Sequence, residues 1–144
     1  MHLAGIMKTS NVLMKLVRAC VDDERTLLHE SRFVDARRAS TLTRLARERE
    51  QFVADLERFG ARGPRRTNGS WAELVREAGR NVWVAAAGRN SGDAIASCRH
   101  SLARTEALYD QAMHESLPDE VGRVLAGHWS CLHEEASELD QLRI

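Results

Sequence analysis

The feature that most constrains this chain is the spacing of its apolar residues, which recur at steps of three and four along four long stretches. This spacing places the apolar side chains on one face of an α-helix. Turn residues bound the stretches and set the expected helices at about residues 10–34, 38–59, 93–115 and 118–142. A capping-box pattern at Ser70 and Glu73 begins a shorter helix over about residues 70–88. Helices with one apolar face bury it against each other, so the pattern predicts an all-α protein.

The lengths of the connections predict how these helices are arranged. Only a few residues separate the first two long helices, and only a few separate the last two, so each pair forms an antiparallel hairpin. About 34 residues run from Gly60 to Asp93, which is enough to carry the chain along the bundle between the hairpins. We therefore expect a ferritin-like antiparallel four-helix bundle whose long crossover contains the 70–88 helix. It forms one domain over residues 10–144, after a flexible N-terminal segment over residues 1–9.

Composition narrows the classes of function that the bundle can serve. The chain has 21 Lys and Arg residues and 21 Asp and Glu residues, so no net positive charge attracts nucleic acid or an anionic membrane. Its longest uncharged apolar run is too short to span a bilayer. The three cysteines lie within apolar helical patterns and form no Cys-x-x-Cys pair, which is typical of reduced cytosolic proteins. We expect a cytoplasmic protein that binds neither a membrane nor nucleic acid.

Polar residues interrupt the apolar stripes at one height of the expected bundle. Glu24 lies about ten residues before the first hairpin turn, and Arg49 and Glu50 lie about as far after it. Glu106 and His128 are placed in the same way around the second hairpin turn. At about 1.5 Å per residue, all of them are about 15 Å from the turns. The sequence therefore predicts a polar layer of these five side chains in the core.

Carboxylates on facing helices at one height are the ligands of di-iron and di-manganese sites. An alternative prediction is therefore a site for iron or manganese, with candidate ligands Glu24, Glu50, Glu106, Glu135 and either His128 or His133. The Glu-x-x-His pairs that complete such sites are missing from the second and last long helices. In addition, His128 and His133 are five residues apart and therefore point about 140° away from each other around their helix.

Arg49 offers a different way to balance the acidic side chains. A guanidinium among carboxylates supplies the positive charge that metal ions would otherwise supply. The leading prediction is therefore a buried salt-bridge network that needs no metal and no cofactor.

Two further patterns have ordinary explanations beside the functional ones. His128, Cys131 and Glu135 share one face of the last helix and could bind one soft metal ion. A buried histidine and thiol beside a carboxylate, without a metal, is the commoner arrangement. Arginines make the second helix locally basic, which would suit Dps-like DNA binding, but acidic residues interrupt that surface.

A series of short motifs resembles a known group of proteins. The motifs are Arg49-x-x-Phe52-x-x-x-Leu56, Gly60 with Pro64, Gly69-Ser70, a tryptophan-bearing short helix, Gly92-Asp93, Cys98, Tyr109 and Leu117-Pro118. In this order, over about residues 10–143, the chain resembles the bacterial ferritin-like four-helix-bundle proteins catalogued as a domain of unknown function. The resemblance implies a ferritin-like fold without an established activity. Members of the group usually carry an acidic residue near the position of Leu102, so this chain departs from them toward an apolar core.

These observations lead to one main hypothesis about function and two alternatives. The main hypothesis is a non-catalytic bundle protein with a role in stress physiology or as an interaction module. We expect it to form a homodimer through the surfaces that bear Trp71, Trp83 and Trp129. The first alternative is a di-iron or di-manganese carboxylate protein with oxidase or metal-storage activity. The second alternative is Dps-like DNA binding.

Overall fold

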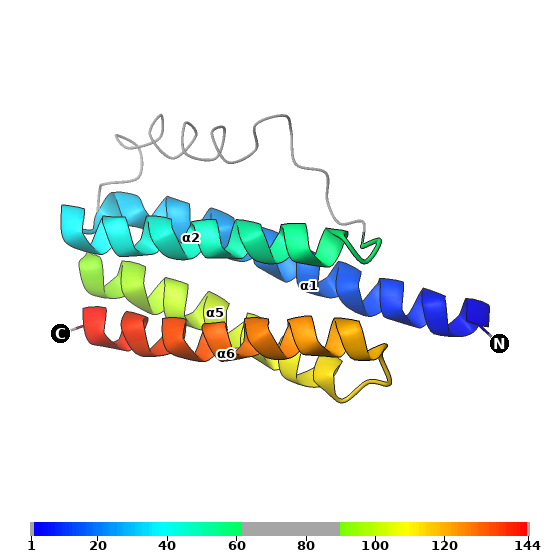
Figure 1. Ribbon diagram of the computed structural model, residues 1–144. Coiled ribbons are helices and arrows are strands. Elements are labelled where there is room, and N and C mark those ends of the chain that lie inside the picture. Colours follow the sequence, from blue (N-terminus) through cyan, green and yellow to red (C-terminus); the bar gives the residue numbers. More distant parts are fainter. Residues whose placement is uncertain (1, 62–89, 144) are drawn as a thin grey trace.

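In the computed structural model, the described residues, 2–61 and 90–143, form a bundle of four long helices and contain no strand (Figure 1). The helices are α1 (His2–Glu30), α2 (Ala36–Glu57), α5 (Ser91–Met113) and α6 (Asp119–Leu142), and the short 3-10 turn η1 (Ser31–Phe33) follows α1. The predicted all-α bundle is therefore confirmed. The 70–88 helix, with Trp71 and Trp83, lies outside the described residues. Within the described part of the chain, no helix is long and apolar enough to cross a membrane.

Helix α1 begins earlier than the sequence indicated. Ser10 and Asn11 suggested a helix start near residue 10, with a separate segment before it, but the helix begins at His2. The hydroxyl of Thr9 donates a hydrogen bond to the carbonyl oxygen of Gly5, at 3.0 Å. Such a bond to the preceding turn lets a hydroxyl residue sit inside a helix rather than cap it. The predicted boundary near residue 10 is therefore wrong, and residues 2–9 belong to α1.

The other helix ends follow their capping residues. Asp35 precedes α2 and its carboxylate accepts a hydrogen bond from the backbone N–H of Arg38, at 2.8 Å. That bond also lowers the pKa of Asp35, because it stabilises the ionised carboxylate. Asn90 caps α5 in the same way, through the N–H of Asp93 at 2.8 Å. After α2, Gly60 adopts a φ of 86°, which favours glycine.

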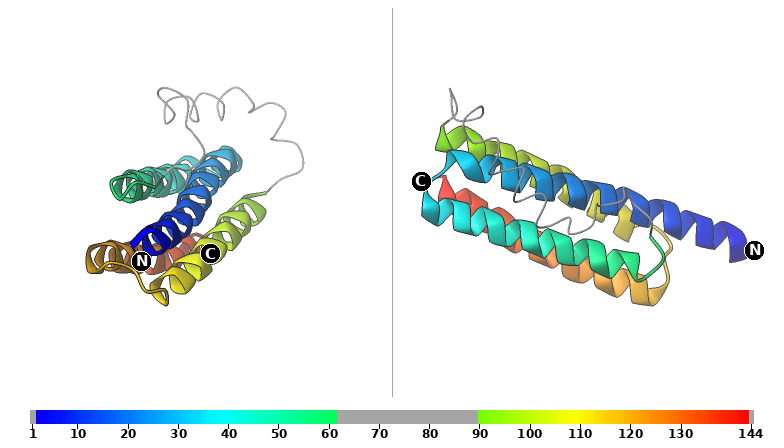
Figure 2. Two further views of the ribbon diagram at one scale, coloured as in Figure 1. Left: turned by 90° about the vertical axis from the view of Figure 1, so that its right-hand side faces the viewer. Right: turned by 90° about the horizontal axis from the view of Figure 1, so that it is seen from above.

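The order of the helices around the bundle explains the need for a long crossover. Helix α1 packs closely against α2 and α5, and α5 packs closely against α6, whereas the backbones of α2 and α6 approach at far fewer positions. Helices α2 and α5 run in the same direction, and the end-on view in Figure 2 shows them at opposite corners. The hydroxyl of Ser91, at the start of α5, lies 3.4 Å from the carbonyl oxygen of Phe33 in η1. Ala61 and Asn90, the described residues on either side of the crossover, therefore lie at opposite ends of the bundle (Figure 1).

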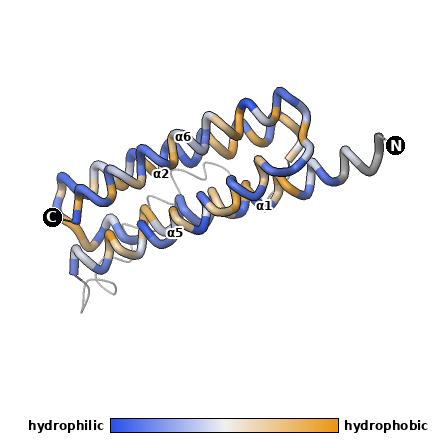
Figure 3. Tube along the Cα trace, turned by 90° about the horizontal axis from the view of Figure 1, so that it is seen from below, coloured by the Kyte–Doolittle hydropathy of each residue, from blue (hydrophilic) through white to orange (hydrophobic). Residues whose placement is uncertain are grey.

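One continuous apolar core lies between the four helices. Its fully buried members include Leu13, Leu16, Leu42, Leu45, Leu56, Ile95, Leu125, Leu132 and Leu139. Hydrophobic and hydrophilic residues alternate along each helix in Figure 3, as expected of helices with one buried side. Burial of each such leucine or isoleucine contributes about 1.5–3 kcal/mol to folding. This apolar surrounding sets the environment of the polar side chains described next.

Candidate functional site

Arg49 of α2 is the centre of a polar cluster in the middle of the bundle, with only 1% of its surface exposed. Its Nε donates a hydrogen bond to Oδ2 of Asp23 on α1, at 3.0 Å. Its Nη1 donates to Oε2 of Glu135 on α6, at 3.1 Å, and its Nη2 donates to the other oxygen of the same carboxylate. Arg49 therefore binds Glu135 through two parallel hydrogen bonds and ties three helices together.

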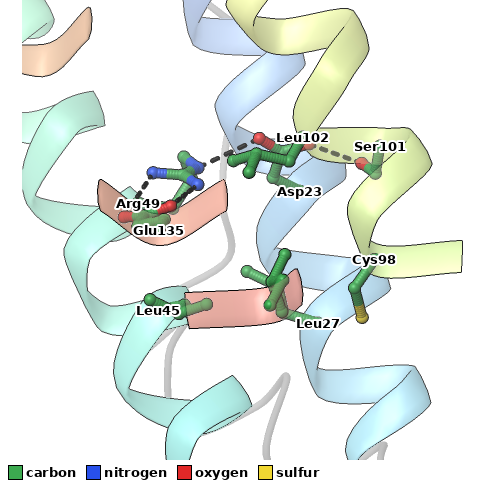
Figure 4. A pocket seen from close by; sticks show the side chains of 9 residues that line it. Asp23, Leu27, Leu45, Arg49, Cys98, Ser101, Leu102 and Glu135 are labelled. Carbon is green, nitrogen blue, oxygen red and sulfur yellow. Dashed lines mark hydrogen bonds and ion pairs between the residues drawn. The ribbon is translucent and has the colours of Figure 1, made fainter. Parts of the chain in front are cut away.

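Helix α5 completes the cluster through hydroxyl groups. The hydroxyl of Ser101 donates a hydrogen bond to Oδ1 of Asp23. The hydroxyl of Thr105 donates to the backbone carbonyl oxygen of Ser101, at 3.3 Å. Figure 4 shows Arg49 between Glu135 and Asp23, with Ser101 reaching Asp23 from the other side. All four helices thus contribute to one buried network, which we call the Arg49 network (Asp23, Arg49, Ser101, Thr105 and Glu135).

The charges of the Arg49 network do not balance when every group is ionised. Two carboxylates, of Asp23 and Glu135, face one buried guanidinium. Burial raises the pKa of Glu135 to about 7, and Arg49 only partly opposes this rise. Burial also raises the pKa of Asp23, against the opposing effects of Arg49 and the hydroxyl donors. Burial alone would lower the pKa of Arg49, but the charge and hydrogen bonds of Glu135 and the charge of Asp23 together outweigh burial and raise it, so the guanidinium stays protonated.

A second group of donors lies between α2 and α6, next to Glu135. The thiol of Cys131 donates to Oε1 of Glu48, at 3.1 Å, and lies 3.6 Å from Oε2 of Glu135. One potential ligand atom from each of these three residues lies within 4.8 Å of the others, and in the described part of the chain they form the group with spacing suited to a metal ion. Burial raises the pKa of the Cys131 thiol strongly, so it keeps its proton at neutral pH.

A small cavity borders the Arg49 network (Figure 4). Its volume is about 10 Å³, and its other walls are the side chains of Leu27, Leu45, Cys98, Leu102 and Leu139. A cavity of this size is at the lower limit for one water molecule. It therefore has no room for an organic substrate beside the charged groups.

A chain of hydrogen bonds forms a second polar group beside the Arg49 network. His128 of α6 lies with Nε2 2.9 Å from Oδ2 of Asp55 and with Nδ1 2.8 Å from the hydroxyl of Tyr109. The Tyr109 hydroxyl in turn lies 3.7 Å from the thiol of Cys20. The ring of Phe52 stacks on His128 with centroids 3.9 Å apart, and the Arg49 guanidinium lies 4.9 Å from the same Phe52 ring. Phe52 thus lies between the two polar groups and contacts a member of each.

The protonation states of this chain follow from its neighbours. Hydrogen bonds from His128 and Gln51 lower the pKa of Asp55 despite its partial burial, so the carboxylate is ionised. Burial lowers the pKa of His128, and Asp55 only partly opposes this, so the imidazole is neutral at neutral pH. His128 therefore donates from Nε2 to Asp55 and accepts the Tyr109 proton at Nδ1. Burial raises the pKa of Cys20 to about 12 and that of Tyr109 well above its usual value.

The structure brings together only part of the polar layer expected from the sequence. Arg49, Glu135, His128 and Glu24 are buried as expected. Glu106 is not in the Arg49 network, because its carboxylate pairs with Arg99 at 3.3 Å near the surface. Glu50 is only half-buried on α2. The five predicted members therefore do not form one layer. Arg49 and His128 belong to two separate polar groups, and Glu50 and Glu106 are only partly buried.

The remaining candidate ligands are also dispersed. His133 is exposed, with Nδ1 3.6 Å from the Glu106 carboxylate and its ring against Trp129. His128 faces Asp55 and Tyr109 rather than Glu135. The histidines predicted as possible metal ligands therefore do not approach the Glu48, Cys131 and Glu135 group. Cys20 and Cys98 are buried free thiols as expected, but Cys131 is partly exposed.

Sequence reasoning missed Asp23, the second partner of Arg49. Asp23 lies three residues after Cys20 and four before Leu27, so it falls on the same apolar stripe. The neighbouring Glu24 lies four residues after Cys20 and three before Leu27, so it fits the stripe equally well and is also buried. Steps of three and four along α1 therefore indicate that Asp23 is buried, but they do not distinguish it from Glu24 as the partner of Arg49.

Comparison of the chain with family models, with curated proteins and with solved structures finds no match. The function is therefore argued from the geometry of the two polar groups. Their thiols and tyrosine have raised pKa values and are poor nucleophiles at neutral pH. What the arrangement does well is to hold four helices in one register through directional bonds.

Proposed function

We propose that this protein is a non-catalytic member of the ferritin-like bundles, in which Arg49 provides the positive charge that two metal ions provide in metal-binding bundles. Support comes from one observation: the buried guanidinium donates to Asp23 and Glu135 on two facing helices. Its charge occupies the centre where a pair of cations would otherwise be needed. The protein then acts in the cytoplasm as an interaction module, with a role in stress physiology.

The proposal includes a homodimer, and among the described residues Trp129 supports it. Trp129 is partly buried against the core and lies against the exposed His133, with ring centroids 4.1 Å apart and ring planes tilted by 53°. A tryptophan at the surface of a bundle suits an interface because one side of the ring is already packed. Light scattering on the purified protein should give twice the chain mass of 16.2 kDa. Replacing Trp129 with serine should shift that mass toward the monomer.

The test of the central proposal compares the wild-type protein with Arg49→Met, which removes the charge but keeps much of the side-chain volume. Thermal unfolding is followed for both proteins with EDTA and with manganese(II) or iron(II) without oxygen. A cation that binds the folded state raises the unfolding temperature. We expect no rise for the wild type and a rise for Arg49→Met, whose two carboxylates have lost their cation. A rise of equal size in the wild type would refute the proposal.

A second candidate function is metal binding at Glu48, Cys131 and Glu135, and the spacing of their ligand atoms favours it. Iron or manganese bound there would support oxidase or storage activity. Elemental analysis of untagged protein purified without chelators distinguishes the two candidates. Near-stoichiometric iron or manganese in the wild type, lost in a Glu48→Ala variant, would favour the second candidate over the first.

A further inference from the structure

One of the four seams between neighbouring helices differs from the other three. Helices α1 and α2, α1 and α5, and α5 and α6 all approach closely along their lengths, whereas the backbones of α2 and α6 are close at few positions. Within each hairpin the turn also joins the two helices covalently. Within the described residues, the α1–α5 and α2–α6 contacts therefore hold the two hairpins together, and the α2 and α6 backbones approach each other less closely (Figure 2).

Polar side chains bridge the α2–α6 seam at successive heights. Arg44 pairs with Glu138 near one end, and its other nitrogen pairs with Glu48. Toward the middle, Arg49 pairs with Glu135, as described above.

Two further bridges continue the series along the same seam. The Cys131 thiol donates to Glu48 next to the Arg49 pair. Farther along, His128 pairs with Asp55, and the His128 ring stacks on Phe52. Along the seam, the bridges thus run from the half-exposed Arg44 to the buried Arg49 and on to His128.

We propose that the bundle opens along the α2–α6 seam, with the α1–α5 contact as the hinge. Local opening occurs where few buried apolar contacts must be lost. Apolar packing lost to water is not replaced, whereas an opened ion pair regains hydration for both charges. The polar bridges therefore act as a latch at the seam where the helix backbones approach least closely.

The Arg49 network determines what changes in the opened form. Asp23 lies in the same hairpin as Arg49, so this ion pair stays intact when the hairpins separate. Glu135 lies in the other hairpin and loses both hydrogen bonds to the guanidinium. Water then reaches Glu135, Cys131 and the stacked Phe52 ring. A partner that binds these newly exposed groups shifts the protein toward the open form in proportion to its preference for that form. The inference needs no metal and does not depend on the proposed function.

The experiment measures distances across the two contacts that join the hairpins. Spin labels on cysteines at the exposed positions Ala54 on α2 and Ala126 on α6 report the seam. Labels at the exposed positions Asp22 on α1 and Ala103 on α5 report the hinge. All proteins carry Cys131→Ser, and the buried Cys20 and Cys98 remain unlabelled in the folded state.

The latch variant is Glu135→Gln, which keeps the shape of the side chain but puts an amide NH2 group where one of the two oxygens accepts a hydrogen bond from Arg49. Loss of one of these two bonds leaves a donor of the buried guanidinium without its acceptor, so the open population should rise about tenfold or more. We expect a longer distance component for the α2–α6 labels and an unchanged distribution for the α1–α5 labels. An unchanged α2–α6 distribution would overturn the proposal, and so would equal broadening of both distributions.

A second variant keeps the test decisive if Glu135→Gln does not fold. Arg44→Ala removes the half-exposed end of the latch, where the side chain is 49% exposed, and should leave the core intact. Because exposed ion pairs are weak, the open population should rise only about twofold to fivefold. The same pattern is required: a change across α2–α6 and none across α1–α5. No change, or a change across both contacts, would overturn the proposal.

Discussion

Replacing Arg49 with methionine tests the view that one guanidinium balances the core. In the folded protein Arg49 makes hydrogen bonds of 3.0 and 3.1 Å to Asp23 and Glu135, with a third bond to Glu135, and all three side chains are almost fully buried. Methionine fills much of the same space, so the cavity contribution is small. The change therefore leaves two carboxylates in the core without their cation.

The expected loss of stability is about 3–5 kcal/mol, the range for breaking a buried ion pair by removing one partner. Urea unfolding at pH 7.5, followed by circular dichroism, measures it through the midpoint at constant slope. The loss should shrink as the pH is lowered toward 5, because protonation of Asp23 and Glu135 removes the uncompensated charge. The same change from arginine to methionine at the exposed Arg104 is the control and should alter stability by less than about 0.5 kcal/mol.

Two results would contradict this reasoning. A loss below about 1 kcal/mol would mean that the ion pairs only offset their own desolvation. A loss that stays the same between pH 7.5 and 5 would mean that it comes from packing rather than from charge. In either case Arg49 would not be the group that balances the acidic side chains.

Three further predictions concern single groups. Because burial raises the folded-state pKa of Glu135 from 4.5 to about 7, its contribution to stability is fully present below pH 4.5 and is lost as the pH rises through about 7. Unfolding measured across this range should show a loss of about 3 kcal/mol that Glu135→Gln removes, and a flat profile would contradict the assignment. In thermal unfolding, Gly60→Ala should destabilise the protein by about 1–2 kcal/mol because φ is 86°. Gly127→Ala should stabilise it by up to about 1 kcal/mol, because Gly127 lies within α6 and has open space around the added methyl group. Tyr109→Phe should cost about 1–3 kcal/mol, because it leaves Nδ1 of His128 without its donor, and an unchanged urea midpoint would sink this interpretation.

Much of the fold could be predicted because the relevant signals are local. The steps of three and four identify four helices, and Gly60 marks the end of α2. The start of α1 could not be placed from Ser10 and Asn11, because the same residue types fit a helix start and a helix interior. Which of these applies depends on whether the preceding residues are helical, and that is decided over a longer stretch than a capping motif covers.

The members of the candidate site were predicted less completely than the helices. Distance from a hairpin turn gives the height of a residue along the bundle, and Arg49 and His128, which were placed in this way, are buried in the core. Height does not give the direction in which a side chain points around its helix axis. Glu106 has the right height but pairs with Arg99 near the surface, whereas Asp23 lies on the buried stripe and binds Arg49. A helix rotation of 100° per residue makes neighbouring positions such as Asp23 and Glu24 face different partners.

The sequence by itself determined that this protein is a helical bundle with acidic residues and one arginine within its apolar stripes. Periodicity and turn residues act over a few residues, so they can be read without knowledge of the rest of the chain. Only the tertiary structure decided that Arg49 pairs with Asp23 and Glu135, and that α2 and α6 meet through polar bridges. Those outcomes depend on how four helices rotate and slide against each other to bury all their apolar faces at once. The charged groups then pair with whichever partners that packing brings within reach.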